Sequence, residues 1–375
     1  MNRLYLNNAA TSFPKFEGTA DFIKELIINK PLNSNRSVFK DNIIESTRKL
    51  IADTFNIKKE ERIIFTSGAT EGFNLLLQPK SLEKRHIIST VIEHNCVLRC
   101  LNALKEVNIT IVGCDNKGFV DISAIESNIN DNTEFVIINH ASNVTGAIQN
   151  IEKLHYICRE RNIQMIVDAS QSAGVLPIDI DKFENASFVF TGHKGLMGLP
   201  GTGFIYINKK LFPEPLKMGG NGIWSDLEEM PSKLPYRYEA GTQNFIGIAS
   251  LWYSLSMIKR TGISTILNRK KEITSKIIKI IQNNKELRLF SPEDENKNIG
   301  IISFSHPDIS SDEFSEMLYD GFNIETRSGL HCAPMIHKSL GTFDEGLVRI
   351  SPSFFTTDEE IDIFATAIAK IIISL

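Results

Sequence analysis

The stretch Phe190-Thr191-Gly192-His193-Lys194-Gly195 decides how the rest of the chain is interpreted. It continues the apolar run Ser187–Phe190, which predicts a β-strand, and it places a lysine behind a hydroxyl, a glycine and an imidazole. A lysine at such a strand end is able to form an imine with an aldehyde cofactor. Taken alone, the pattern is only moderately specific, because lysines at strand ends are common and usually solvated.

Two stretches upstream also place polar side chains where strands are expected to end. The run Met165–Val167 is followed by Asp168, a carboxylate suited to keep the pyridine nitrogen of pyridoxal phosphate (PLP) protonated. Ile63–Phe65 leads through the small residues Thr66–Thr70 into a helix start, where backbone N–H groups and hydroxyls make a phosphate cradle. Each stretch by itself is explained equally well by an ordinary helix cap. The coincidence of all three favours a PLP site.

Together these stretches resemble the class V aminotransferase family of PLP enzymes, and within it the cysteine desulfurases and the selenocysteine lyases. The similarity runs nearly end to end, through Tyr5–Thr11, Thr66–Asn74, Glu93-His94, Ser142–Gly146, Val167–Gly174, Thr191–Lys194, Tyr238–Asn244, Arg327–Pro334 and Val348–Ser351. The resemblance implies the PLP-dependent transferase fold type I, with the cofactor between two domains. Matches in this order are a stronger signal for the fold and the cofactor than for the substrate.

The composition is that of an ordinary globular chain. It has 375 residues, 42% of them hydrophobic, and a net charge of −4, so no nucleic-acid partner is expected. No signal-peptide layout and no window resembling a membrane span is present, so we expect no membrane association. Five cysteines without paired spacing fit a reducing compartment and a cytoplasmic location. Cys96 and Cys100 lie close to His94, but a closed zinc site needs four ligands, so no metal site is expected.

Apolar runs and helix-length segments alternate along most of the chain, which predicts the α/β class. Seven runs are expected to form strands: Arg62–Phe65, His86–Thr90, Thr110–Val112, Phe135–Asn139, Gln164–Val167, Ser187–Phe190 and Gly203–Ile207. Segments such as Ile151–Arg161 separate them, which indicates a mainly parallel seven-stranded sheet covered by helices. We expect an N-terminal segment (1–14) near the active site, a large PLP-binding domain (15–258) and a smaller α+β domain (259–375) that carries Cys332 and Arg349.

The resemblance assigns the contacts to the cofactor ring. It implies that Lys194 carries the cofactor and then moves a proton between substrate and cofactor. Asp168 is expected to pair with the pyridine nitrogen, Gln171 to donate to the phenolic oxygen, and His94 to stack on the ring face. Without the resemblance, His94 is also explained as a helix-capping or core histidine.

The resemblance also assigns the phosphate contacts. They are the Ala69 backbone, the Thr70 hydroxyl, Thr191 and His193. Many relatives carry a hydroxyl where this chain has Ala69, so one hydrogen bond is expected to be missing. Thr242 is expected to reach the phosphate bound by the neighbouring subunit, which makes a homodimer part of the active site.

The substrate's α-carboxylate is assigned by resemblance to Arg349, whose planar guanidinium binds both oxygens at once. Asn143 is expected to reach the same carboxylate or a cofactor oxygen. Asn8 and Ala9 are assigned to the same substrate site. Arg36 is a weaker candidate, because such an arginine is more often solvated or structural.

Cys332 separates a desulfurase from an ordinary aminotransferase. In the cysteine desulfurases a cysteine thiolate attacks the sulfur of bound L-cysteine, which leaves L-alanine and an enzyme persulfide. His331, next to it, and Arg327, otherwise a weak carboxylate candidate, are candidates to favour the thiolate. The segment Arg327–Pro334 resembles the short loop of group II desulfurases, which pass sulfur to a protein acceptor in pathways such as iron–sulfur cluster assembly. Leu330 departs from that pattern, since a second histidine is frequent there.

Three hypotheses about function remain open. A cysteine desulfurase acting on L-cysteine is favoured. A selenocysteine lyase, or another class V aminotransferase or β-lyase, is the alternative on the same scaffold. A non-catalytic interaction protein on a degenerate scaffold is disfavoured by the joint presence of Lys194, Asp168, Gln171, His94 and Arg349.

Overall fold

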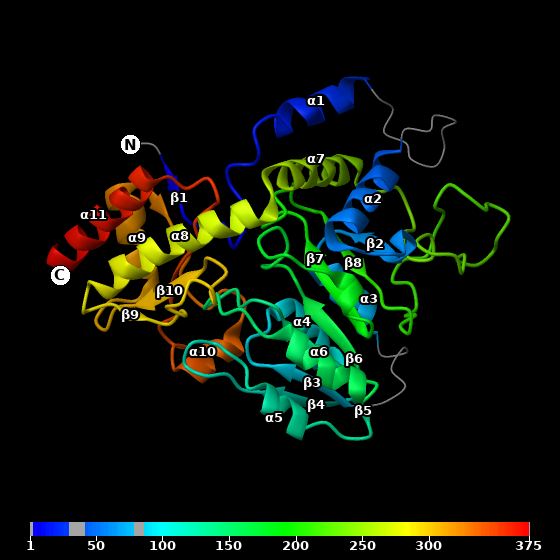
Figure 1. Ribbon diagram of the computed structural model, residues 1–375, viewed down its shortest axis with the longest axis horizontal. Helices are drawn as coiled ribbons and strands as arrows, with labels where there is room; N and C mark the ends of the chain where they lie inside the picture. The colour runs from blue at the N-terminus through cyan, green and yellow to red at the C-terminus, as the bar shows by residue number, and fades with distance from the viewer. Residues whose placement is uncertain (1–2, 30–41, 79–85, 375) are drawn as a thin grey trace.

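The structure is a computed structural model that describes residues 3–29, 42–78 and 86–374. Figure 1 shows a larger and a smaller lobe, which are connected where α7 (Phe245–Thr261) is followed by the long helix α8 (Ile263–Gln282). Both ends of the chain lie in the smaller lobe. There β1 (Leu4–Tyr5) pairs in parallel with β11 (Ile324–Glu325), so the start of the chain is built into the C-terminal part.

The larger lobe is built on one seven-stranded sheet with the strand order β2-β8-β7-β6-β5-β3-β4. The strands are β2 (Ile63–Thr66), β3 (His86–Thr90), β4 (Asn108–Val112), β5 (Thr133–Asn139), β6 (Gln164–Asp168), β7 (Ala186–Thr191) and β8 (Gly203–Tyr206). Strand β8 runs antiparallel to β2 and β7, and the other pairings are parallel. The carboxyl ends of β5, β6 and β7 therefore meet at one edge, where ligands bind in open α/β sheets.

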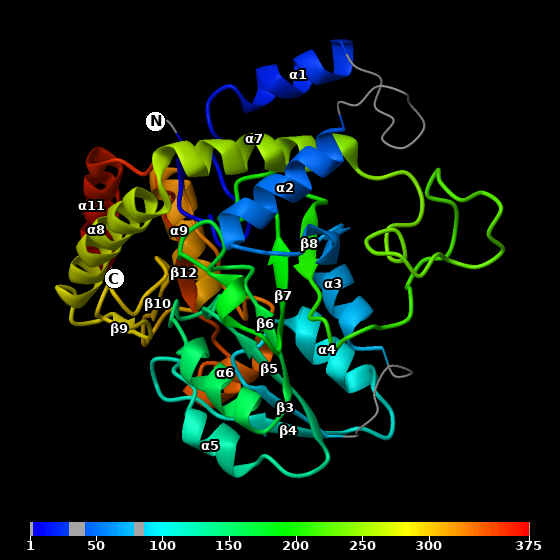
Figure 2. The same cartoon turned by 45° about the vertical axis from the view of Figure 1, so that its right-hand side comes forward.

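Helices cover both faces of this sheet (Figure 2). Alternate residues of a strand enter different cores: on β5, Val136 and Ile138 join one cluster, whereas Phe135 and Ile137 join the other. The first cluster includes residues of α2 (Ile43–Phe55), α5 (Ile122–Ser127), α6 (Ile151–Glu160) and α7, and the second those of α3 (Ala69–Leu76) and α4 (Asn95–Ala103). Because both faces are buried, the central strands β5, β6 and β7 contain continuous apolar runs instead of alternating apolar and polar residues.

Helix α6 shows how local sequence produces a covering helix. Its buried residues Ile151, Leu154, Ile157 and Cys158 recur at helical spacing, so one stripe faces the sheet. The Asn150 side chain caps the helix by accepting a hydrogen bond from the backbone N–H at position 153, at 3.0 Å. The helix consequently begins at the residue that the sequence predicted.

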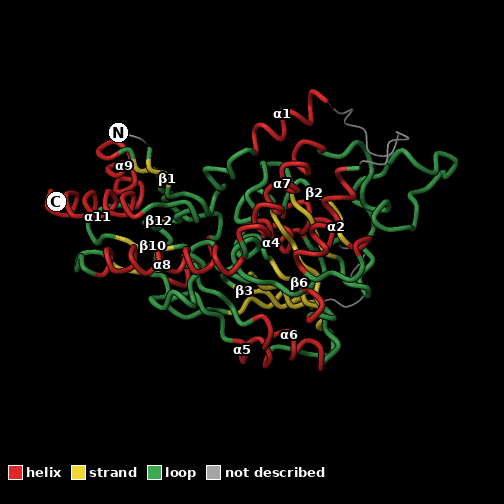
Figure 3. The backbone as a smooth tube through the Cα atoms, turned by 45° about the horizontal axis from the view of Figure 1, so that its top comes forward, coloured by secondary structure: helices red, strands yellow, loops and turns green. Residues whose placement is uncertain are grey.

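The smaller lobe has its own antiparallel sheet, with the order β12-β10-β9. Its strands are β9 (Arg288–Leu289), β10 (Ile302–Ser305) and β12 (Val348–Ile350). Helices α8, α9 (Ser311–Phe322) and α11 (Asp358–Ser374) share a separate hydrophobic cluster with it. Figure 3 shows this group of helices apart from the strands of the larger lobe. Two further helices are α1 (Thr19–Asn29) and α10 (Pro334–Leu340).

The predicted α/β class and the mainly parallel seven-stranded sheet are confirmed. All seven predicted runs form strands, each within two residues of the predicted bounds. The domain boundaries after residues 14 and 258 stay predictions. Among the residues that the structure describes, no helix combines the length and the apolar character that crossing a bilayer demands.

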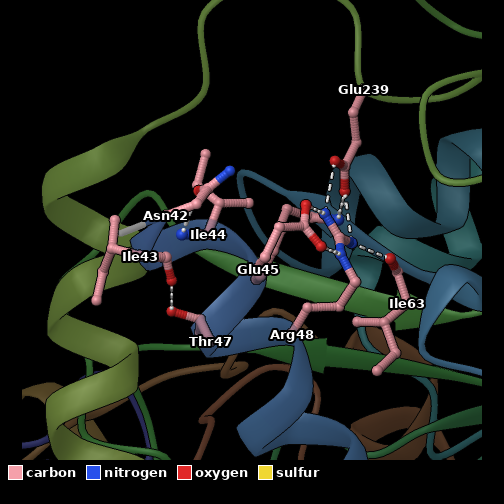
Figure 4. Close-up of polar contacts among 9 residues, drawn as sticks. Asn42, Ile43, Ile44, Glu45, Thr47, Arg48, Ile63 and Glu239 are labelled. Atoms are coloured by element: carbon pink, nitrogen blue, oxygen red, sulfur yellow. Dashed lines mark hydrogen bonds and ion pairs between the residues drawn. The ribbon is translucent and has the colours of Figure 1, made fainter. Parts of the chain in front are cut away.

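A buried ion pair ties α2 to the loop that precedes α7 (Figure 4). Arg48 on α2 has a 1% exposed side chain, and its two terminal nitrogens donate to the Glu239 carboxylate at 2.9 and 3.0 Å. Arg48 also donates to the Ile63 carbonyl, while Glu239 accepts from the Phe65 backbone N–H at 2.8 Å. The pair therefore holds strand β2, which leads into α3, together with the loop that carries Thr242.

We expect Arg48→Met to lower the free energy of unfolding by about 3–5 kcal/mol, because the substitution leaves Glu239 buried without its partner. Chemical denaturation followed by circular dichroism measures the change. Arg159→Met is the matched control, because the ion pair of Arg159 with Glu160 is exposed and its loss should cost less than about 1 kcal/mol. Equal effects of the two substitutions would contradict the role given to the buried pair.

Candidate active site

A cavity of about 460 Å³ lies at the carboxyl ends of β5, β6 and β7. Most of the residues that the sequence singled out are in its walls: Ala9, Ala69, Thr70, His94, Asn143, Asp168, Gln171, Thr191, His193, Lys194, Arg327, His331 and Arg349. They come from segments that are far apart in the chain and from both lobes. The tertiary fold therefore assembles one polar site from the separate motifs.

Asp168 and Lys194 follow adjacent strands. Asp168 is the last residue of β6, and Lys194 lies just beyond the end of β7, its parallel neighbour. The turns after the two strands touch at Gly174 and Gly195, where a Cβ atom on either glycine would collide with the backbone of the other turn. Gly174 also has a φ of +79°, which favours glycine. This close approach fixes the lysine loop against the aspartate turn.

The electrostatic surroundings of Lys194 suit a nucleophile and a base. Burial lowers the pKa of the Lys194 ammonium, and the negative charge of Asp168 acts in the opposite direction. A lowered pKa increases the neutral fraction of the amine, which is the form that attacks a carbonyl group or accepts a proton. Asp168 is 2% exposed, and its Oδ1 accepts a hydrogen bond from the Ser170 backbone N–H at 2.9 Å.

His94 caps helix α4 and lines the cavity at the same time. Its Nδ1 accepts from the Cys96 backbone N–H at 3.1 Å, which assigns the proton of the neutral ring to Nε2. Burial and then the charge of Lys194 lower the pKa of His94 to about 4. The two explanations of His94 are therefore compatible: Nδ1 caps helix α4, and the face of the neutral ring remains available to stack on a cofactor ring.

Donors suited to a phosphate collect at the start of α3 and at the end of β7. Ala69 and Thr70 occupy the first turn of α3, where backbone N–H groups have no partner within the helix. Thr191 ends β7 and His193 follows it. Burial lowers the pKa of His193 to about 4, so this imidazole contributes a hydrogen-bonding group and no charge.

Buried polar atoms without a partner mark the cavity as a ligand site. Among the described residues, they include Ser170 Oγ, His193 Nδ1, Asn143 Oδ1 and Arg349 Nε. Buried polar atoms are normally satisfied, so these four indicate a bound molecule with several donors and acceptors. A phosphorylated pyridine ring with a phenolic oxygen has this character, and the residues present fit PLP.

Arg349 is a buried cation that has no ion pair in the described part of the chain. It is 1% exposed; its Nη1 donates to the Asn143 carbonyl at 2.9 Å and its Nη2 to Asn7 Oδ1 at 3.1 Å. Burial lowers the pKa of Arg349 to about 9, and the charge of Arg327 adds to the shift. A buried charge with neutral partners is costly, so an anionic ligand at this place would be stabilised.

The Cys332 thiol lies beside Arg327. The Nη2 atom of Arg327 is 3.2 Å from Cys332 Sγ, and a guanidinium at this distance stabilises negative charge on sulfur. The backbone is held on both sides, since Asn95 N–H donates to the Cys332 carbonyl at 2.7 Å and Asn143 Nδ2 to the His331 carbonyl at 2.8 Å. The φ angles of +50° at His331 and +57° at Cys332 are strained for residues other than glycine, so tertiary contacts maintain this loop.

Both ring nitrogens of His331 lie within hydrogen-bonding distance of groups other than the Cys332 thiol. Its Nε2 lies 3.2 Å from the Arg327 carbonyl oxygen, and its Nδ1 lies 3.4 Å from Nε2 of His337. Burial lowers the pKa of His331 well below its ordinary value, so the ring is neutral. The suggestion that His331 favours the Cys332 thiolate gains no support from this geometry, in which Arg327 is the cation beside the sulfur.

Some predicted residues are not in the walls of this cavity, and Cys332 is one of them: its neighbours Arg327 and His331 line the cavity. Asn8 uses its amide within the N-terminal segment, where Nδ2 donates to the Ser351 carbonyl at 3.1 Å. Thr242 lines a separate cavity of about 170 Å³. Ser67 borders both cavities, which places Thr242 behind the start of α3. Arg36 lies outside the described residues.

The sequence analysis missed Ser170 and Glu93, although both stand within its motifs. Ser170 lines the cavity two residues after Asp168. Glu93, next to His94, accepts at Oε1 from Thr90 Oγ1 at 2.7 Å and from the Asn139 backbone N–H at 2.9 Å. Burial raises the pKa of Glu93 to about 8. The sequence signals for Glu93 were its place in the Glu93-His94 motif and its position shortly after a buried strand.

A larger cavity, of about 670 Å³, lies near α2, α6 and the junction of α7 and α8. Its walls are largely apolar, with Phe55, Ile178 and Phe183 among them, and no residue predicted for the active site borders it. Size therefore does not identify the active site. The concentration of titratable groups with shifted pKa values identifies the smaller cavity as the candidate active site.

A lysine and an aspartate at adjacent strand ends, beside an anion cradle, define a cofactor-dependent α/β enzyme. The sequence profile of the class V aminotransferases matches residues 4–364. A probable cysteine desulfurase of Pyrococcus abyssi is 31% identical to this chain, over 99% of it and 95% of the relative. A cysteine desulfurase of Wigglesworthia glossinidia brevipalpis is 29% identical, over 98% of this chain and 92% of the relative.

A solved structure leads to the same family. The apo structure of a cysteine desulfurase from Thermococcus onnurineus NA1 matches this fold with a TM-score of 0.91 at 29% identity, and the match covers 100% of this chain and 95% of that one. The chain belongs to the class V aminotransferase family, and the resemblance seen in its motifs is confirmed.

We expect Glu93→Gln to change how stability depends on pH. The pKa of Glu93 in the folded chain, about 8, lies above its ordinary value, so the stability contributed by its neutral form falls progressively as the pH rises from that ordinary value to about 8. Relative to the Gln variant, the wild type should lose on the order of 4 kcal/mol between about pH 5 and pH 9. Urea denaturation of both proteins measures the difference, with the exposed Glu359→Gln as control. A difference that stays constant with pH would contradict a buried neutral acid.

Proposed function

We propose that this chain is a PLP-dependent cysteine desulfurase that converts L-cysteine to L-alanine and retains the sulfur as a persulfide on Cys332. The observation that carries the proposal is that Arg327, which lines the cavity together with Lys194 and Arg349, lies 3.2 Å from the sulfur of Cys332. An aminotransferase needs a lysine and a carboxylate-binding arginine, but no thiol held beside the substrate. The relatives named as cysteine desulfurases support the same activity.

PLP fits the cavity through its ring and its phosphate. The residues that would hold it are Lys194 at the aldehyde carbon, Asp168 at the pyridine nitrogen, His94 against the ring, Gln171 at the phenolic oxygen, and Ala69, Thr70, Thr191 and His193 at the phosphate. One amide hydrogen of Gln171 is already donated to the Ala9 carbonyl at 3.0 Å, and the second is free for an oxygen acceptor. When bound, PLP supplies an electron sink that weakens the bonds at the substrate's Cα atom.

Arg349 is proposed to bind the α-carboxylate of L-cysteine. The carboxylate would be the anionic partner that this buried guanidinium lacks, and the planar guanidinium can donate to both carboxylate oxygens at once. Asn143, whose backbone carbonyl already contacts Arg349, is proposed to reach the same substrate through its unpartnered Oδ1, which accepts from an amine. Ala9 borders the same space.

Lys194 and Cys332 are proposed to move the proton and the sulfur. The neutral amine of Lys194 takes the proton from the substrate's Cα and returns a proton during alanine formation. The Cys332 thiolate, held beside Arg327, attacks the substrate sulfur and forms an S–S bond. The C–S bond of L-cysteine breaks, its electron pair stays with the carbon, and that carbon gains a proton as the methyl group of L-alanine.

The proposed activity implies partners. We infer a homodimer in which Thr242 reaches the phosphate site of the neighbouring subunit, because Thr242 lies in a cavity separate from Lys194 of its own chain. A protein acceptor is needed as well, since the persulfide on Cys332 must be discharged before the next turnover. Delivery to iron–sulfur cluster assembly in the cytoplasm fits this chemistry.

Incubation of the PLP-loaded protein with L-cysteine should add the mass of one sulfur atom to the chain and release L-alanine. Cys332→Ala should lose the adduct and the alanine, whereas Cys100→Ala should keep both. Intact-mass spectrometry and an alanine assay measure the two products. Pyruvate or a keto acid without the adduct would move the assignment to a β-lyase or an aminotransferase. Activity of Cys332→Ala on selenocysteine alone would indicate that the thiol is specific to sulfur removal.

Thr242→Ala should weaken PLP binding about tenfold, which corresponds to the loss of one hydrogen bond to a charged phosphate. Fluorescence titration of the chain freed of PLP measures this change, and Thr366→Ala on the exposed side of α11 is the control. Light scattering should find a dimer in both variants. A monomer that binds PLP as tightly as the wild type would contradict the role given to Thr242.

A further inference from the structure

Four donors converge on the carbonyl oxygen of His193. They are the Ser12 backbone N–H at 2.9 Å, the Ser12 hydroxyl at 3.0 Å, the Thr11 hydroxyl at 3.3 Å and Lys15 Nζ at 3.4 Å. A carbonyl oxygen has two lone pairs, so this set of donors is unusually dense. All four belong to residues 11–15 of the N-terminal segment.

This oxygen belongs to the peptide group that joins His193 to Lys194, so fixing it sets the direction of the Lys194 backbone. The surrounding loop is closed by hydrogen bonds from Met197 N–H to the Lys194 carbonyl at 2.9 Å and from Gly198 N–H to the residue 192 carbonyl at 2.8 Å. Lys15 spans the loop, because its Nζ also donates to the Gly198 carbonyl at 2.7 Å. The turn after Asp168 touches the loop as well, through its glycine contact.

Lys15 is a half-buried cation with neutral oxygen partners. Its Nζ donates to Ser12 Oγ at 2.8 Å in addition to the carbonyls of His193 and Gly198, and no carboxylate forms an ion pair with it in the described segments. Burial lowers the pKa of Lys15 to about 8. An ammonium in such a place is a poor source of overall stability, which indicates a local function at the loop.

The same segment also contacts the buried Arg349, another residue that lines the cavity. Asn7 Oδ1 accepts from Arg349 Nη2 at 3.1 Å. The Ala9 backbone N–H donates to Ser351 Oγ at 2.8 Å, and the Ala9 carbonyl accepts from Gln171 Nε2 at 3.0 Å. Residues 7–15 therefore run from β12 in the smaller lobe to the Lys194 loop in the larger lobe.

We propose that Ser12 and Lys15 are positioning residues for Lys194, and that segment 7–15 is a strap that joins the Lys194 peptide to Arg349. The strap sets the direction of the Lys194 amine relative to the carboxylate-binding arginine, and neither Ser12 nor Lys15 lines the candidate active-site cavity. The effect on turnover rests on the proposed desulfurase function. The effect on the loop does not depend on it.

Amide hydrogen exchange of the chain without PLP tests the structural half of the proposal. Lys15→Met and Ser12→Ala should accelerate exchange in a peptide covering residues 192–198 about tenfold, because the loop loses donors that hold it closed. Exchange in β6 should not change, and Lys24→Met, at an exposed lysine of α1, should behave as the wild type. Unchanged exchange in the loop, or acceleration throughout the sheet, would overturn the proposal.

Steady-state kinetics with L-cysteine tests the catalytic half. Lys15→Met and Ser12→Ala should lower kcat about tenfold and leave KM unchanged, since Arg349 remains intact. A rise in KM at constant kcat would place these residues at substrate binding and overturn the positioning role. If the wild type forms no alanine, the desulfurase proposal fails, whereas the exchange experiment still decides whether the strap holds the Lys194 loop.

Discussion

An excess of positive charge in a buried cavity governs this site. Lys194, Arg327 and Arg349 line it, and Asp168 is the one acidic residue in its walls among those that the structure describes. Burial lowers the pKa of both Lys194 and Arg349 because their charged forms lose hydration, and the neighbouring charge of Arg327 lowers both further. The folded chain therefore stabilises anions at this place, and a phosphate, an α-carboxylate and a thiolate are the anions that the proposed chemistry requires.

The fold supplies rigid supports for these charges. Asp168 and the Lys194 loop follow neighbouring parallel strands, and the two turns approach so closely at Gly174 and Gly195 that neither position has room for a Cβ atom. The Cys332 loop is held in a strained backbone conformation by two hydrogen bonds, one of them from Asn143. A strained loop that is held from both sides presents its thiol in one direction, which favours attack on a bound substrate.

The sequence predicted local structure well because the physical signals are local. The strands of a sheet that is buried on both faces are continuous β-branched and aromatic runs, and β3 has the bounds that its run predicted. Most of the residues that the family resemblance assigned to the site, from Ala69 to Arg349, line one cavity, while the roles assigned to them stay predictions. His94 was open to two explanations because capping and stacking use the same ring, and only the structure shows that it caps α4 while it faces the cavity.

What the sequence by itself determined is the class of fold, the lysine and aspartate at adjacent strand ends, and the arginine and cysteine near the end of the chain. What only the tertiary structure decided is which distant groups meet. Arg48 and Glu239 are 191 positions apart, and Asn7 and Arg349 are 342 positions apart. Burial depends on the whole fold. The shifted pKa values of Glu93 and His331, which burial causes, therefore cannot be recognised from the residues next to them in the sequence. The side-chain periodicity of helices and strands relates residues that are close in the chain, and it can therefore be recognised in the sequence. Desolvation and ion pairing depend on neighbours in space.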